Sequence, residues 1–341
     1  MRKILLVAVF SLFALGTGYK VNQAHLSPKR DEASQFIAAI LRGDGTLVPF
    51  AQYGNGGWSN PWPDPRRSAE SIYAEDTEVI PHSLGELPEP WFRQCGKIPE
   101  TWYFWSLAAA PAVLSVSRVM QVENHSQTNW ALLTSFPKQS AEDSHHRNIG
   151  IALNVNEKIE PMIEIKTESV EGADLLSFIK QLFDEAETAE LNKIRAKQLP
   201  EIEASTPFFS LSSEARAKVR MSITKLCRTK SSLNGKHLYY FEAEKQYEKP
   251  ATSTDPKCND VSLFQGWMEA TERGGLGLMD SRLFLTNCDK KGPSSATPLG
   301  IMTLKNEIFL FVSEHGWEDE SYMILELNNS GLHKVLETFG G

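Results

Sequence analysis

The sequence predicts a mainly β fold, and three observations support that prediction. The C-terminal third alternates apolar and polar residues in short runs that end at Gly, Asn or Asp, which is typical of antiparallel strands joined by tight turns. Helical spacing is clear in only two segments. A similar stretch occurs twice, around Gly150 and around Gly300, and repetition of one small unit favours an architecture built from copies of a sheet.

Residues 1–24 have the layout of a signal peptide. Arg2 and Lys3 precede an apolar run over residues 4–15, and small residues follow. A membrane-spanning helix needs about twenty apolar residues, so this run is short for a span, and an uncleaved anchor is the alternative. We expect cleavage after Gly18 or Ala24, a secreted or periplasmic mature protein, and no transmembrane span after cleavage.

The two segments with helical spacing are residues 28–42 and residues 174–198. The apolar positions of the first are Ala33, Phe36, Ile37, Ile40 and Leu41, and Gly43 follows them as a terminator. The second contains neither Gly nor Pro, and its acidic start and basic end suit the helix dipole. The sequence therefore predicts an N-terminal helix and one long helix inserted between β regions.

Most of the remaining chain reads as strands. Asn234-Gly235 is a strong hairpin signal between residues 221–228 and 237–246, although residues 213–226 also fit a helix. A second hairpin surrounds Gly274-Gly275. Beyond it, the expected strands of an antiparallel meander are residues 298–304, 307–314, 322–327 and 332–339.

The repeat around Gly150 and Gly300 suggests how the sheets are organised. Each copy has a strand, a polar loop, a second strand that starts at a Gly, and a tight turn at Asn-Glu. A propeller blade takes about 40 to 45 residues, so the prediction is a β-propeller or, alternatively, tandem antiparallel β-sheets. The expected divisions are a Trp-rich β half over residues 25–172, the long helix over 173–200 and a meander half over 201–341.

The aromatic residues of the N-terminal half are the first candidates for ligand binding. Six of the eight tryptophans lie between Trp58 and Trp130, in a region rich in turn formers. Exposed rings on loops stack on sugars or grip prolines, while buried rings would only anchor the loops to the core. The candidate ligand-binding residues are Trp58, Trp62, Trp91, Trp102, Tyr103 and Trp105.

Signals for catalysis are weak, because the common nucleotide, zinc and serine-hydrolase motifs are missing. The candidate acids are Glu314, Glu318 and Glu320, beside His315 in a predicted turn, where the alternative is a solvated charged loop. The Asp143-Ser144-His145-His146 loop has catalytic residue types, but neighbouring residues cannot form a relay. We expect no metal site and no cofactor, and whether the chain is an enzyme stays open.

Charge and cysteines complete the sequence-based expectations. With 35 basic and 43 acidic side chains, the chain is mildly acidic, which argues against nucleic acid as a partner. The hairpin around Gly274-Gly275 brings Cys258 and Cys288 to the same end, so we expect them to form a disulfide. The expected function is a non-catalytic carbohydrate-binding, peptide-binding or scaffolding role outside the cytoplasm. The alternative is an extracellular hydrolase that uses a carboxylate pair in a cleft.

Overall fold

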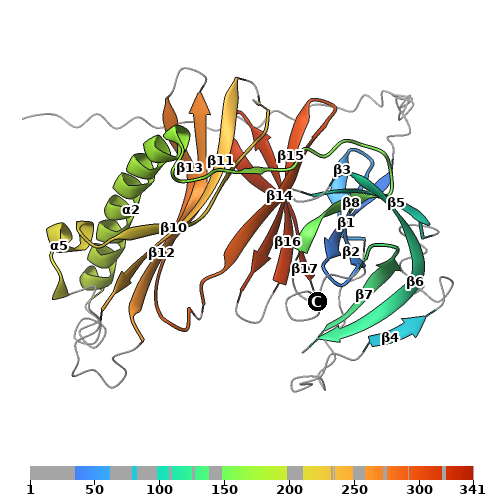
Figure 1. The fold of residues 1–341 in the computed structure, drawn as a ribbon, viewed down its shortest axis with the longest axis horizontal. Coiled ribbons are helices and arrows are strands. Elements are labelled where there is room, and N and C mark those ends of the chain that lie inside the picture. Colours follow the sequence, from blue (N-terminus) through green and yellow to red (C-terminus); the bar gives the residue numbers. More distant parts are fainter. Residues whose placement is uncertain are drawn as a thin grey trace, which may run out of the picture.

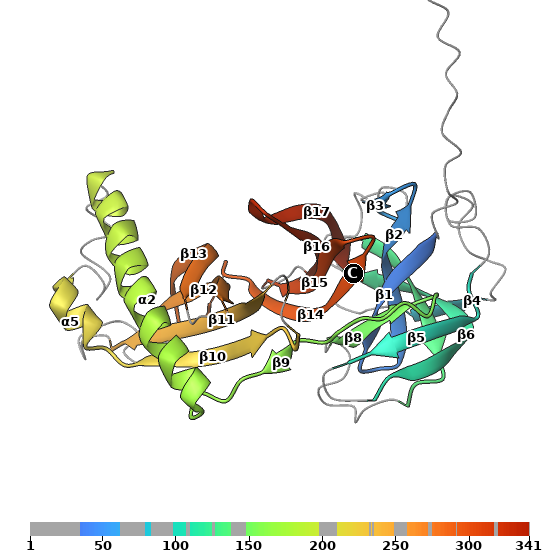
Figure 2. The same cartoon turned by 90° about the horizontal axis from the view of Figure 1, so that it is seen from above.

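The computed structural model has four layers, which are visible in Figure 2 as a helix, two sheets and a barrel. It describes residues 35–61, 79–82, 98–106, 110–124, 127–137, 148–197, 210–231, 233, 235–248, 258–271, 275–290, 292–316 and 320–340. Strands dominate, so the predicted mainly β class is confirmed. None of the described helices is long and apolar enough to cross a membrane.

The N-terminal region forms a closed six-stranded barrel (Figure 1). Its strands, in the order in which they pair, are β1 (Phe36–Arg42), β8 (Asn148–Leu153), β5 (Thr101–Trp105), β6 (Ala112–Asn124), β7 (Gln127–Thr134) and β2 (Thr46–Gly54), and β2 pairs again with β1. Two short strands, β3 (Gly57–Ser59) and β4 (Val79–His82), extend the sheet beside β2 and β6. Closure leaves the six barrel strands without a free edge.

The predicted N-terminal helix is wrong where the structure describes it, because Phe36–Arg42 is strand β1. Ile37, Ala39 and Leu41 belong to one core cluster with residues of every other barrel strand, while Phe36, Ala38 and Ile40 belong to another that reaches the meander. Both faces are covered, so all six positions before Arg42 are apolar. Such a continuous run contains apolar residues at helical spacing by default. The part of the predicted helix before residue 35 lies outside the described residues.

The second sheet has five antiparallel strands in the order β13 (Leu276–Asn287), β12 (Asp260–Thr271), β11 (Lys236–Tyr247), β10 (Met221–Arg228) and β9 (Ile163–Glu164). The long helix α2 (Val170–Ala196) covers one of its faces and confirms the predicted helix near residues 174–198. Ser169 caps the helix by accepting a hydrogen bond from the Gly172 amide. Leu175, Ile179 and Phe183 pack against Phe241 and Phe264 of the sheet.

Residues 213–226, whose sequence fits either a helix or a strand, contain one of each. A short helix, α5 (Ser213–Ala217), comes first, and β10 follows. The predicted hairpin is confirmed, since β10 pairs antiparallel with β11 across a turn in which Gly235 has φ 77°.

The third sheet is the predicted meander of β14 (Ser295–Leu304), β15 (Glu307–His315), β16 (Glu320–Asn328) and β17 (Gly331–Gly340). It lies between the five-stranded sheet and the barrel. Residues Ile308, Leu310 and Val312 face the five-stranded sheet, whereas Phe309 and Phe311 pack with the barrel. The continuous apolar run in β15 therefore reflects a strand that is covered on both faces.

The strands do not form a propeller in the described part of the chain; tandem antiparallel sheets, the second form of the prediction, match the structure. Gly150 lies in barrel strand β8, where a Cβ would collide with the Trp105 carbonyl. Gly300 lies in β14, where a Cβ would come within 2.6 Å of Ile159 Cγ2. Both glycines permit close packing, but they lie in different sheets. The two stretches are similar in sequence because short strand-turn-strand units use the same few residue types. No blade repeat is therefore shown.

Candidate functional site

The described tryptophans that we expected to bind ligand belong to the core. Trp102 is 0% exposed, and its Nε1 donates a hydrogen bond to the Pro99 carbonyl at 3.0 Å. Trp105 is also buried, and Tyr103 is half-buried against the core cluster that contains Trp105. Trp62 and Trp91 lie outside the described residues. A ring without an accessible face cannot stack on a sugar, so this geometry favours the anchoring role for Trp102 and Trp105.

Trp58 is half-buried at the boundary between the barrel and the meander. Its ring centroid lies 5.2 Å from Tyr53, 5.5 Å from Phe36 and 5.6 Å from Phe309, with edge-to-face geometry. These contacts join β1, β2 and β3 of the barrel to β15. Trp58 therefore contributes to the packing of the barrel against the meander.

The candidate acids Glu314 and Glu320 do not form a pair. Glu314 Oε1 accepts a hydrogen bond from Arg282 of β13 at 3.0 Å, on the face toward the five-stranded sheet. Glu320 Oε2 is 2.9 Å from Arg42 Nη2 of β1, on the face toward the barrel. Glu318 lies outside the described residues. Because the two carboxylates point to opposite sides of the meander and each has a cation, they cannot act together on one glycosidic bond.

Glu320 belongs to a polar cluster in the seam between the barrel and the meander. Arg42 also donates to the Tyr322 hydroxyl at 3.1 Å, and Asn148 of β8 donates to Glu320 and to Ser313 Oγ. Burial alone would lower the pKa of Arg42, but neighbouring Tyr322 and Glu320 raise it above its ordinary value. Arg42 therefore stays charged, and its pairing with Glu320 links the two bodies.

The same seam contains a Ser-His-Glu arrangement that sequence reasoning missed. Ser313 Oγ lies 2.9 Å from His315 Nε2, and His315 Nδ1 lies 3.7 Å from Glu320 Oε1. These residue types and this order of contacts suit nucleophilic catalysis. However, Ser313 is 0% exposed and also accepts a hydrogen bond from Asn148. A substrate carbonyl has no path to this buried hydroxyl in the structure. The cluster is therefore suited to holding the barrel and the meander together. The loop over residues 143–146, which also has catalytic residue types, lies outside the described residues.

A second buried ionic cluster holds α2 on its sheet. Lys245 is 0% exposed, and its Nζ lies 2.6 Å from Asp184 Oδ1 and 3.2 Å from Glu187 Oε2. Glu187 also accepts hydrogen bonds from Tyr247 and Ser262, each at 2.6 Å. Burial raises the pKa of Tyr247, as does its bond to Glu187. With its polar groups engaged by each other, this cluster is suited to positioning the helix rather than to binding a ligand.

One pocket of about 380 Å³ opens where the ends of three hairpins meet. The β10–β11 turn contributes Leu233, the β12–β13 hairpin contributes Leu278 and Met279, and the β16–β17 turn contributes Leu327. Leu238, Met279 and Leu327 are also part of the core cluster between the two sheets. The pocket is therefore the outer end of an apolar seam, and its volume lies within the usual range for ligand sites of about 300 to 1,000 Å³.

Charged groups line the rim of this pocket. Lys236 Nζ donates to both carboxylate oxygens of Glu269 at 2.8 Å, and Asn328 lies across the opening in the β16–β17 turn. No Phe, Tyr or Trp lines the pocket in the described part of the chain. The site combines an aliphatic floor with a polar rim. Its residues come from three separate hairpins, so no local pattern in the sequence could reveal it.

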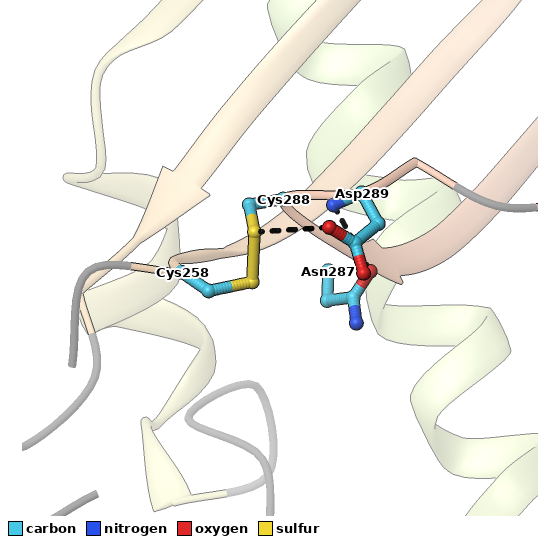
Figure 3. The surroundings of a disulfide bond; sticks show 4 residues. All are labelled: Cys258, Asn287, Cys288 and Asp289. Carbon is cyan, nitrogen blue, oxygen red and sulfur yellow. Dashed lines mark hydrogen bonds between the residues drawn. A yellow bond between two sulfur atoms is a disulfide. The ribbon is translucent and has the colours of Figure 1, made fainter. Parts of the chain in front are cut away.

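The predicted Cys258–Cys288 disulfide is confirmed (Figure 3). It joins two residues that lie just beyond the Asp260–Asn287 end of the β12–β13 hairpin, one position out of register with each other. Asp289 Oδ1 lies 3.7 Å from Cys288 Sγ, which is a contact rather than a hydrogen bond because a disulfide sulfur carries no hydrogen. Cys227 is a free, buried cysteine, and burial raises the pKa of its thiol to about 12. It is therefore unreactive at neutral pH.

The geometry singles out the pocket between the hairpin ends as the accessible candidate site, while the two ionic clusters serve packing. Comparison with family models, with curated proteins and with solved structures finds no match to this chain.

Proposed function

We propose that this protein is an exported, non-catalytic binding protein that holds a peptide in the pocket between its hairpin ends. The observation that carries the proposal is the lining of this pocket, with Leu238, Met279 and Leu327 in the floor and the Lys236–Glu269 ion pair on the rim. An aliphatic floor accepts a hydrocarbon side chain, and the charged rim accepts the polar backbone on either side of it.

A peptide suits this lining better than a carbohydrate does. Sugar-binding sites commonly present a flat aromatic ring to the apolar face of the sugar. The described pocket residues include no Phe, Tyr or Trp, and Trp102 and Trp105 are buried elsewhere. The peptide alternative is therefore the one that we retain.

Export is proposed on two grounds. Residues 1–24 have the charge and apolar layout of a signal peptide, and the Cys258–Cys288 disulfide suits an oxidising compartment. A secreted or periplasmic location agrees with both. The division of the chain into residues 25–172, 173–200 and 201–341 stays a prediction.

A binding experiment with two matched variants tests the peptide site. Leu278 is 41% exposed and lines the pocket, whereas Val335 is 38% exposed on β17 and does not. We expect fluorescence anisotropy to detect binding of labelled peptides with alternating Lys and Leu residues, and L278R to weaken it by about tenfold, equivalent to about 1.4 kcal/mol. V335R should bind as the wild type does. Equal effects of both variants, or preferential binding of a glycan panel, would contradict the proposal.

A further inference from the structure

Strand β13 is an open edge of the five-stranded sheet. All of its twelve residues except Met279 pair with β12 on one side, and in the described part of the chain no strand pairs with them on the other. None of the twelve is buried, although Phe264, Trp267 and Met268 of the neighbouring β12 are. An edge strand presents every second N–H and C=O outward, and these groups can pair with an added strand.

The free edge leads directly into the pocket. The β12–β13 register pairs Trp267 with Asp280 and Met268 with Leu278, so Met279 is the extra residue of a bulge. Met279 packs against the core between the sheets, and both Leu278 and Met279 line the pocket. From Asp280 to Leu285 the ladder with β12 is regular. The bulge thus separates a regular edge from the pocket at its end.

We propose that an extended peptide pairs with β13 along Asp280–Leu285, as a sixth strand of this sheet, and inserts an aliphatic side chain into the pocket beside Leu278. This inference rests on the proposed function and specifies how the peptide is held. Backbone hydrogen bonds along an edge supply affinity that is independent of sequence, and a pocket at one position of the added strand supplies specificity.

The charges along the edge favour a cationic peptide. Arg282 is already paired with Glu314 at 3.0 Å. Asp280 is exposed and has no ion-pair partner among the described residues. The whole chain has a formal net charge of −8, which attracts cations over a longer range. Lysine or arginine next to the aliphatic anchor therefore complements this surface.

Selective N-methylation of the probe tests strand addition. The probe is a labelled hexapeptide of alternating Lys and Leu, and two versions carry N-methyl groups on the Lys amides or on the Leu amides. Only one of these sets faces β13 in an added strand, so we expect one version to lose about tenfold or more in affinity and the other to bind as the parent does. D280K should weaken binding of the parent peptide, whereas E185K, the same charge change on the exposed side of α2, should not.

The outcomes separate this inference from the proposed function. If both methylated versions bind as the parent does while L278R still weakens binding, the pocket holds a peptide but strand addition is wrong. If D280K and E185K weaken binding equally, the attraction is a general effect of charge and the edge has no special role. If the parent peptide does not bind the wild type, the proposed function fails together with the inference. Circular dichroism of each variant checks that it is folded.

Discussion

Arg42 Nη2 of the barrel and Glu320 Oε2 of the meander are 2.9 Å apart, although 278 residues separate them in the chain. Both side chains are almost completely buried, and Asn148, Ser313 and Tyr322 surround them. This ion pair and its hydrogen bonds set the position of the barrel on the sheet, while the aromatic contacts of Trp58 supply apolar area at the same boundary.

Loss of one partner of this ion pair should destabilise the protein strongly. We expect E320A to lower the free energy of unfolding by about 3 kcal/mol, because Arg42 would remain buried without its counter-charge. The exposed Lys334–Glu337 pair provides the control, and E337A should change the free energy by less than about 1 kcal/mol. Urea unfolding followed by circular dichroism measures both. An E320A effect as small as that of E337A would show that the seam pair is not important for stability.

The buried cluster under α2 should make stability depend on acid pH. Burial alone would raise the pKa of Asp184, but hydrogen bonds from Lys245 and Lys180 lower it below the ordinary value of 3.8. A carboxyl with a lowered folded-state pKa stabilises the fold at pH values above its unfolded pKa, and this contribution is lost as pH falls through the folded value. Glu244, beside Lys290 and Gln246, has a pKa lowered in the same direction. Stability should therefore decline below about pH 4.

The D184N variant tests the contribution of this carboxyl. Urea unfolding at a series of pH values should show a shallower decline below about pH 4 for D184N than for the wild type, because the variant lacks the titrating group. Identical slopes for the two proteins would contradict the assignment to Asp184.

The disulfide should add stability by restricting the unfolded chain. Cys258 and Cys288 are 30 residues apart, and a loop of this length corresponds to about 3 to 4 kcal/mol in the chain-entropy model. We expect C258S/C288S to have a free energy of unfolding lower by that amount, measured by urea unfolding, and to keep its sheet content, because the large core does not depend on the crosslink. Alkylation of Cys258 or Cys288 in the native wild type without reductant would contradict the pairing.

Gly300 should be intolerant of a side chain. A Cβ there would lie 2.6 Å from Ile159 Cγ2 and 3.3 Å from the Glu160 carbonyl oxygen. We expect G300A to cost about 1 to 3 kcal/mol through overpacking. Gly57 is the matched control, since a Cβ there meets nothing within 4 Å, and G57A should stay within about 0.5 kcal/mol of the wild type. Thermal and urea unfolding of both variants test this, and equal stability would contradict the close approach of β14 to residues 159–160.

The local patterns of the sequence predicted the elements whose surroundings are simple. The helix over Val170–Ala196 has one packed face and one solvated face, so its spacing is unambiguous. The meander and the β12–β13 hairpin follow from turn residues and alternation, and that hairpin was sufficient to predict the Cys258–Cys288 disulfide. The sequence predicted catalytic and binding residues less well. Among the tryptophans expected to bind ligand, Trp102 and Trp105 are buried and pack in the core.

The sequence by itself determined the β class, the long helix and the disulfide, because each depends on neighbours in the chain or across one turn. Only the tertiary structure decided that Phe36–Arg42 is a strand, that Glu314 and Glu320 face opposite ways, and that three hairpin ends enclose a pocket. The physical reason is that residue periodicity reports how many faces of an element are covered. It does not report what covers them, and that depends on contacts between residues far apart in the chain.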